Sequence, residues 1–551
     1  MKRYDIAVIG MGGVFPGSRN VEEFWKNVLS GKTFIKDMPK KYWRWENYFS
    51  KDTSLIDKSY TEKGSFIDDF EFPFNKYKFP PNTMKSVDPA QLVALESARE
   101  ALEDAGIEPH SSALDEAVTI LGVSGVDGYA HGCVYLRRNN YFERLQNHLR
   151  KNGVSEKIIK ELHTEFEQEV LKRHPIKMFA VGAIPSALSN RVAQVFGAKG
   201  YNMTVDAACA SSFGALETAC HALMAGDVRV AITGGIDLGV NPAVYIGFSR
   251  VEGLSFSGIA NPFDHKADGL VIGEGGGIVI LKRLEDALAD GDKIKAVIRG
   301  MGSSSDGAGQ AIYNPSVKGR ARAFKMALER AEVSSDDVQF IEAHATSTVV
   351  GDANEYDAIA AAYAKGRNKN NPLYLGSVKY QIGHLKAAAG VAGLIKTIKG
   401  MQSGTVPHMP LYEKLTPHVK ESVDAFVIPT KIVDWEPNKN GSRISAVTSS
   451  GFGGCNYHVI LEQGEKYIPV NKRPKIDREI AIVGVTCRVA GADDIDTFWE
   501  NVTSGKKVFS KVDPKELKWT HHVDSGPENE RIYTKVISTL KPYSIDYLKY
   551  K

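Results

Sequence analysis

The strongest constraint on the fold of this chain is a long internal repeat. Residues 480–506 match residues 6–32 without gaps, with 11 identities in 27 positions. An offset of 474 residues is far too long for an array of stacked repeats, so it indicates a second whole domain of the same kind. The chain ends inside that second copy, and we expect it to be part of a longer multidomain polypeptide.

The repeat predicts the domain boundaries. Residues 1–462 are expected to form the first domain, and residues 479–551 the truncated start of the second. Residues 463–478, rich in Lys, Glu and Pro, are expected to be the linker between them. The truncated copy carries no counterpart of the Cys and His motifs described below, so it cannot be a second active site.

Composition excludes several classes of protein. The chain has 69 Lys and Arg against 66 Asp and Glu, and this small net charge gives no electrostatic reason to expect a nucleic-acid partner. The N-terminus lacks a signal-peptide pattern, and the long uncharged run at 444–461 is too polar for a membrane span. The five cysteines show neither C-x-x-C pairs nor zinc-ligand spacing, so we expect no metal site and a cytoplasmic location.

One cysteine stands in a position suited to chemistry. Residues 202–207 read as a strand, 211–225 as a helix ending at a glycine, and 228–234 as a further strand. Cys209 falls between the first strand and the helix. The free N–H groups and the dipole at a helix start favour a thiolate and can also donate to an oxyanion.

Two histidines follow predicted strands in the same way. His344 comes after the apolar strand 338–342, and His384 after the strand 373–378. Active sites of α/β proteins gather at such strand ends. The sequence therefore predicts a pocket in which Cys209, His344 and His384 meet.

The motifs around these residues resemble those of the β-ketoacyl synthase family, the decarboxylating condensing enzymes of fatty acid and polyketide assembly. The similar segments are DAACASS at 206–212, EAHATST at 342–348, KYQIGH at 379–384 and GFGG at 451–454. These motifs also follow the family's order of Cys, His and His. The resemblance covers about residues 5–462. The second copy resembles the opening of another ketosynthase-like domain, as in the ketosynthase and chain-length-factor arrangement of polyunsaturated fatty acid synthases.

The resemblance implies an α/β fold of the thiolase type, a five-layer αβαβα sandwich of two similar halves. In this sequence the halves are expected at about 5–255 and 256–462. The family implies a homodimer, or a pseudo-dimer with the neighbouring ketosynthase-like domain.

The resemblance also implies a reaction. Cys209 would take an acyl chain from the phosphopantetheine arm of an acyl carrier protein. His344 and His384 would assist decarboxylation of a malonyl thioester and donate to the enolate oxygen. The backbone N–H groups of Cys209 and Phe452 would form a second oxyanion hole. No cofactor or metal would be bound by the domain itself, because phosphopantetheine stays on the carrier protein.

Four further residues take supporting roles by resemblance. Lys379 would pair with Glu355 and hold the two histidine loops, without reacting. Thr346 and Thr348 would hydrogen-bond the pantetheine arm.

The sequence departs from the family pattern at three positions. Ala345 and Ser347 stand where glycine is usual, and we expect them to narrow the pantetheine channel. Lys386 stands where an acidic or small residue is more common. Two rival functions stay open: a non-elongating ketosynthase that only transfers acyl chains and often lacks one histidine, and a silent carrier-protein-docking scaffold, which would lack Cys209.

Overall fold

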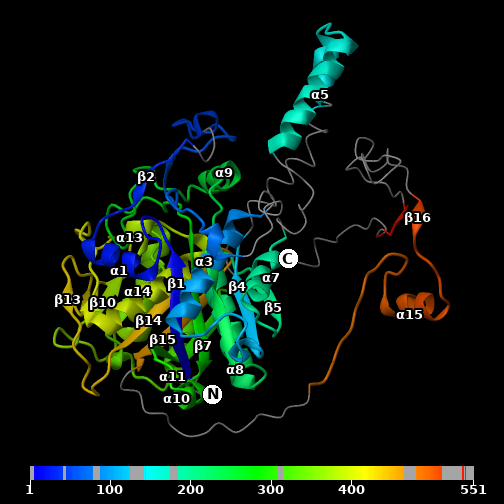
Figure 1. Cartoon of the computed structure of the whole chain (residues 1–551). Coiled ribbons are helices and arrows are strands. Elements are labelled where there is room, and N and C mark those ends of the chain that lie inside the picture. Colours follow the sequence, from blue (N-terminus) through cyan, green and yellow to red (C-terminus); the bar gives the residue numbers. More distant parts are fainter. Residues whose placement is uncertain are drawn as a thin grey trace. The chain divides into compact units, whose positions relative to one another are not determined.

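A computed structural model describes residues 5–40, 45–77, 87–124, 142, 144–173, 184–307, 314–464, 480–511, 536–538 and 540 (Figure 1). The chain forms two compact units. The first comprises residues 1–133 and 171–473, and the second comprises residues 134–170 and 474–551. The expected linker lies outside the described residues except for its first two, Gln463 and Gly464.

The first unit is built on one sheet of 11 strands. The strands are β1 (Ile6–Val14), β4 (Ala117–Gly122), β5 (Asn202–Val205), β6 (Val230–Asp237), β7 (Gly275–Arg283), β8 (Ala296–Ser305), β9 (Phe340–Glu342), β10 (Leu373–Gly376), β12 (Phe426–Val427), β14 (Ile444–Gly451) and β15 (Cys455–Gln463). Their order is β12-β10-β9-β14-β15-β8-β1-β7-β6-β4-β5.

The sheet consists of two similar halves. The series β5-β4-β6-β7-β1 and β10-β9-β14-β15-β8 match in order and in sense: the first three strands are parallel and the later pairings are antiparallel. Strands β1 and β8 join the halves. The expected division at residue 255 is too early. Because β7 is hydrogen-bonded to both β6 and β1, the first half extends through Arg283.

Six helices complete the five layers. They are α3 (Pro89–Asp104), α7 (Ser186–Phe196), α8 (Ser211–Ala225), α11 (Val317–Ala331), α12 (Val349–Tyr363) and α14 (Ala389–Ser403). Helices α3 and α7 share a core with the first half, and α11 and α12 share one with the second. Helices α8 and α14 share the core between the halves and are buried nearly all round, as a middle layer requires. The expected αβαβα sandwich is confirmed.

Further helices and strands are present in both units. In the first unit they are α1 (Val21–Ser30), β2 (Ile35–Asp37), β3 (Lys63–Ser65), α9 (Pro242–Arg250), α10 (Leu284–Asp290), α13 (Lys379–Ile382), β11 (Thr405–Val406) and β13 (Val433–Asp434). The others are α5 (Glu156–Arg173), α15 (Ile495–Thr503), β16 (Ser510–Lys511) and β17 (Val536–Ile537). Among all these described helices, none has both the length and the apolar character that a membrane crossing needs.

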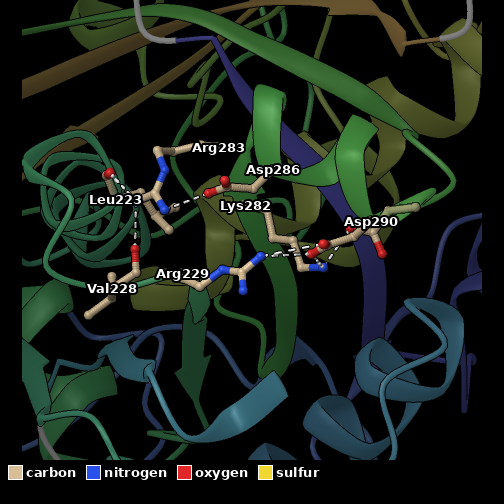
Figure 2. A network of polar contacts seen from close by, with 8 residues as sticks. Leu223, Val228, Arg229, Lys282, Arg283, Asp286 and Asp290 are labelled. Carbon is tan, nitrogen blue, oxygen red and sulfur yellow. Dashed lines mark hydrogen bonds and ion pairs between the residues drawn. The ribbon is translucent and has the colours of Figure 1, made fainter. Parts of the chain in front are cut away.

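A polar network fastens the C-terminal end of α8 (Figure 2). Arg283 donates from Nη1 to the carbonyl oxygens of Leu223 at 2.8 Å and Val228 at 2.7 Å. Beside it, Lys282 donates to Asp290 at 2.8 Å, and the Asp290 carboxylate also forms an ion pair with Arg229. The guanidinium of Arg283 thus joins the last turn of α8 to the chain just before β6. Helix α8, which starts just after Cys209, is therefore anchored at its far end.

The second unit repeats a local structure of the first. In α1, Asn27 donates from Nδ2 to the carbonyl oxygen of Gly17 at 2.7 Å. In α15, Asn501 donates in the same way to Gly491 at 2.9 Å. The pairs are related by the offset of the sequence repeat. The two segments therefore share their turn and helix as well as their sequence.

Candidate active site

Cys209 lies on a sharp turn between β5 and α8. The residue before it, Ala208, has a left-handed backbone with φ of 51°. Ser211 stabilises the turn because its Oγ accepts the N–H of Ala207 at 2.9 Å and donates to the carbonyl oxygen of Ala208 at 2.6 Å. Strained backbone of this kind persists where surrounding contacts hold it. The turn places the buried thiol of Cys209 at the wall of a cavity.

The glycine-rich loop 451–454 lies against this turn. A Cβ atom on Gly451 would come within 2.2 Å of the carbonyl oxygen of Ala207, so only glycine fits there. Ser449 donates from Oγ to the carbonyl oxygen of Cys209 at 3.2 Å. The N–H of Phe452 donates a hydrogen bond to the Cys209 thiol. The backbone N–H of Phe452 therefore lies beside the sulfur, which is the position expected for a donor of the oxyanion hole.

The thiol of Cys209 is less acidic than the sequence predicted. Burial raises the pKa of Cys209 to about 11, and the carboxylate of Asp237 contributes to the rise. Lys386, the Phe452 N–H and Lys379 act in the opposite direction and are outweighed. The expectation of a resting thiolate is therefore wrong, because desolvation disfavours the charged form more than these groups favour it.

This acidity makes a prediction for chemical modification. Alkylation of Cys209 by iodoacetamide is expected to accelerate about tenfold per pH unit from about pH 7 to pH 10, because only the small thiolate fraction reacts. Site-resolved mass spectrometry measures the rate, with the unfolded protein as the control. A rate for the folded protein that levels off near pH 8 would contradict the raised pKa.

His344 is held by its backbone and by one ring nitrogen. Glu355 accepts the N–H of His344 at 2.8 Å and the N–H of Ala345 at 2.7 Å. The Nδ1 atom of His344 accepts the N–H of Ser450 at 3.3 Å. Burial, with Lys379 nearby, holds the pKa of His344 well below its ordinary value, so the ring is neutral. A neutral ring that accepts at Nδ1 carries its proton at Nε2.

His384 has the same protonation pattern. Its backbone N–H donates to the carbonyl oxygen of Val271 at 2.7 Å, and its Nδ1 accepts the N–H of Lys386 at 3.3 Å. Burial and the nearby Lys379 hold the pKa of His384 well below its ordinary value. The ring centroids of His344 and His384 lie 5.3 Å apart, and the two ring planes make an angle of 85°. The site therefore holds two neutral imidazoles, each with an Nε2–H donor.

The expected ion pair between Lys379 and Glu355 is wrong. Both residues are described and buried, and no ion pair joins them. The Glu355 carboxylate is instead used by the two backbone N–H groups of the His344 loop. Burial lowers the pKa of Lys379, while Glu342 and Glu355 act in the opposite direction. Glu355 therefore holds the His344 loop by accepting its backbone N–H groups, and not by pairing with Lys379.

One cavity of about 390 Å³ brings most of the predicted residues together. The predicted residues in its lining are Cys209, His344, Thr346, Thr348, His384 and Phe452. Lys379 and Glu355 do not line it. The hydroxyls of Thr346 and Thr348 lie 3.0 Å apart on the wall. Across the described residues, His, Cys, Asp and Glu nowhere form a group of three that could hold a metal ion.

Ala345 and Ser347 do not narrow this cavity, contrary to expectation. Both side chains are buried away from its lining. Ser347 has a left-handed backbone, with φ of 69°, and its Oγ accepts the N–H of Asn261 at 2.8 Å. The serine therefore takes the backbone conformation that favours glycine and directs its hydroxyl into the protein.

Two charged residues near the site were not predicted from the sequence to act there. Asp237 ends β6, and its carboxylate lies 3.0 Å from Lys386 Nζ. Asp237 follows the strand predicted at 228–234, as His344 and His384 follow theirs, so its place at a strand end was the available signal. Lys386 stands out in the sequence only as a departure from the family pattern.

Comparison with known families gives two matches. The model "Beta-ketoacyl synthase, N-terminal domain" matches residues 3–287 and again residues 477–542. The model "Beta-ketoacyl synthase, C-terminal domain" matches residues 295–413. The first model thus covers the first half of the sheet and, separately, much of the second copy.

Among curated proteins, one component of the phenolphthiocerol/phthiocerol polyketide synthase of Mycobacterium bovis is 33% identical over 461 residues. The match covers 83% of this chain and 23% of that protein. A component of the polyunsaturated fatty acid synthase of Thraustochytrium sp. is 34% identical over 486 residues, covering 85% of this chain and 17% of the relative. The chain thus spans about a quarter or less of the length of these two relatives.

Solved structures agree with these matches. An oxazolomycin ketosynthase domain of Streptomyces albus superposes with a TM-score of 0.71 at 27% identity, covering 84% of this chain and 76% of that one. The ketosynthase from module 6 of the bacillaene synthase of Bacillus subtilis gives a TM-score of 0.69 at 27% identity, covering 84% of this chain and 72% of that one.

Proposed function

The chain belongs to the β-ketoacyl synthase family, and we propose that its first domain catalyses decarboxylative Claisen condensation. An acyl chain on Cys209 reacts with a malonyl-carrier-protein thioester, and a polyketide or fatty acyl chain grows by two carbons. One observation carries the proposal: a thiol and two neutral imidazole donors line the same cavity.

The first step loads the acyl chain. Cys209 Sγ attacks the thioester carbonyl of an acyl chain on the phosphopantetheine of an acyl carrier protein. The carbon–sulfur bond to pantetheine breaks, and the pantetheine thiol leaves with the proton of Cys209. The N–H groups of Cys209 and Phe452 stabilise the developing oxyanion. The N–H of Phe452 already points at Sγ in the resting site.

The second step forms the new carbon–carbon bond. A malonyl thioester enters, its bond to the carboxylate breaks, and CO₂ leaves while the electron pair forms an enolate. The Nε2–H groups of His344 and His384 donate to the enolate oxygen. The enolate carbon then attacks the acyl carbonyl, the Cys209 carbon–sulfur bond breaks, and its electron pair returns to Sγ, which takes up a proton from water. Thr346 and Thr348 bind the pantetheine arm, and Glu355 and the buried Lys379 support the histidine loops.

Two other functions are less consistent with this site. A ketosynthase that only transfers acyl chains needs the thiol and its N–H donors, and has no use for a pair of enolate donors. A silent docking scaffold needs neither. The presence of Cys209, His344 and His384 around one cavity therefore favours elongation.

A reconstituted reaction separates the three functions. The protein is incubated with an acyl-carrier thioester and then with a malonyl-carrier thioester, and acyl-protein, CO₂ and 3-oxoacyl product are followed by mass spectrometry. Elongation gives all three. Acyl-protein without a 3-oxoacyl product would indicate a transferring ketosynthase, and no acyl-protein at all would indicate a scaffold.

We also propose that residues 479–551 are the start of a second ketosynthase-like domain, after a linker at 463–478. The shared hydrogen bond and the second match to the N-terminal family model support this. In the first copy Phe24 is 1% exposed and Trp25 is 7% exposed, whereas their counterparts Phe498 and Trp499 are 38% and 64% exposed.

Hydrogen exchange at Trp499 should slow in a chain carrying the whole second copy. Unchanged exchange would contradict the assignment.

The edge of the sheet supports a dimer. Within the described residues β5 pairs only with β4, and the adjoining side chains of Tyr201 and Met203 are exposed. An exposed edge strand can pair with a second sheet. The partner is another copy of this chain, or the second ketosynthase-like domain in a longer chain.

We expect Met203→Lys to shift the mass in solution from dimer to monomer. A wild-type protein that is monomeric at micromolar concentration would contradict the homodimer.

A further inference from the structure

A buried ion pair joins the two halves of the sheet beside the active-site cavity. Lys386 Nζ lies 3.0 Å from Asp237 Oδ1 and donates to the carbonyl oxygen of Gly273 at 2.7 Å. The Lys386 side chain is 6% exposed and that of Asp237 is 1% exposed. Asp237 ends β6 in the first half, and Lys386 follows His384 by two residues in the second. The pair therefore connects the His384 loop to the opposite half.

The Asp237 carboxylate is fixed on every side. Oδ2 accepts the hydroxyl of Ser124 at 2.6 Å and the N–H of Ala387 at 3.3 Å. Oδ1 accepts the N–H of Gly239 at 2.9 Å in addition to the ion pair with Lys386. A carboxylate with this many donors has little freedom to turn. Asp237 is thus a rigid anchor for Lys386.

The ion pair acts on His384 through the backbone of Lys386. That backbone is left-handed, with φ of 50°, which is unfavourable for a residue with a Cβ atom. In this conformation the N–H of Lys386 donates to Nδ1 of His384 at 3.3 Å. The contacts of Nζ with Asp237 and Gly273 hold the side chain at its far end. They therefore help to keep the backbone where its N–H reaches the imidazole.

We propose that the Asp237–Lys386 pair is a positioning device for condensation, which keeps the Nε2–H of His384 directed at the enolate oxygen. This inference rests on the proposed condensation activity. Without the pair, the Lys386 N–H leaves Nδ1, and the ring is free to rotate or to carry its proton on the other nitrogen. Loading of Cys209 does not use His384 as a donor, so the orientation of His384 does not limit it.

The same two charges act on Cys209. Asp237 raises the pKa of the thiol and Lys386 lowers it. The charged groups that act on the thiol are Asp237, Lys379 and Lys386. The other charged or titratable groups on its cavity wall are Glu252, Asp268, Asp306, Arg320, His344 and His384. Of the three charged groups that act on the thiol, Asp237 is the negative one, so replacing it by Asn removes the charge that raises the pKa of Cys209. Replacing Lys386 by Met removes one of the two positive charges.

The first test separates positioning from folding. Lys386→Met is expected to load more slowly at neutral pH, because the pKa of its thiol is higher, so condensation is measured from the isolated acyl-protein. There it should be about 10²-fold slower than in the wild type, because misplacing a donor by an ångström costs about that much. Lys282→Met is the matched control. Lys282 is also a lysine of a buried ion pair, and its side chain is 7% exposed (Figure 2). It stands near the end of β7, whereas Gly273 precedes the start of that strand. Condensation of the Lys386→Met acyl-protein at the wild-type rate would overturn the proposal.

A double variant covers the case in which Lys386→Met leaves Asp237 unpaired and unfolds the domain. Asp237→Asn/Lys386→Met removes both buried charges, which relieves the cost of an unpaired one. The proposal expects this variant to fold and load but still to condense about 10²-fold more slowly. If condensation returns together with stability, the pair has only a structural role and the proposal is wrong.

A third readout does not depend on condensation. The pH profile of Cys209 alkylation should move to lower pH in Asp237→Asn and to higher pH in Lys386→Met. Because this measurement needs no carrier protein, it tests the pair even if the protein turns out not to condense. Profiles that coincide with the wild type in both variants would show that the pair does not act on the site.

Discussion

Replacing Cys209 by alanine is expected to abolish both acyl loading and 3-oxoacyl product. The variant keeps the turn, because Ser211 and the loop 451–454 hold backbone atoms and do not depend on the thiol. It loses the only atom that can carry the acyl chain in the proposed mechanism. Without that covalent intermediate, the enolate has no acyl group to attack.

The measurement is the intact mass of the protein after incubation with an acyl thioester. Cys220→Ala is the matched control, because Cys220 is also buried but lies within α8, away from the lining of the cavity. It should gain one acyl group at the wild-type rate. Acyl transfer to the Cys209→Ala variant would place the nucleophile elsewhere and contradict the account.

Replacing either histidine by alanine is expected to separate the two half-reactions. His344→Ala and His384→Ala should load the acyl chain but condense about 10²–10³-fold more slowly, the usual cost of losing one oxyanion donor. Loading is spared because the thiol and the N–H of Phe452 are unchanged. The two variants should resemble each other, because both rings are neutral Nε2–H donors facing one cavity.

The two rates are measured separately, loading by intact mass and condensation by the 3-oxoacyl product. His221→Ala is the control, because His221 is an exposed histidine of α8 and its loss should change neither rate. Condensation at the wild-type rate in either active-site variant would remove that histidine from the proposed mechanism.

Local sequence pattern was enough to predict the elements around Cys209. The strand at 202–207, the helix at 211–225 and the strand at 228–234 correspond to β5, α8 and β6. The bounds of the helix were correct because Gly226, in the left-handed conformation, ends it. Strand ends were also informative, because parallel strands bring their ends to one edge of a sheet. His344 and His384 follow the parallel neighbours β9 and β10, and Cys209, which follows β5 in the other half, lines the same cavity.

Long-range effects could not be read from the same pattern. The pKa of Cys209 depends on how deeply the whole fold buries it, and the position of the thiol before a helix suggested the opposite direction. The pair of Asp237 and Lys386 joins residues far apart in the sequence, and neither charge has a local reason to be buried. The boundary of the first half was placed too early, at residue 255, because the pairing of β7 with β1 joins residues far apart in the sequence.

The most direct test of the central claim is a chase of isolated acyl-protein. The protein is loaded on Cys209, freed of excess thioester and mixed with a malonyl-carrier thioester labelled in the free carboxylate. The account predicts that the acyl mass leaves Cys209 while labelled CO₂ and a 3-oxoacyl thioester, longer by two carbons, appear in equal amounts. Release of labelled CO₂ with the acyl group still on Cys209, or loss of the acyl group without a new carbon–carbon bond, would contradict it.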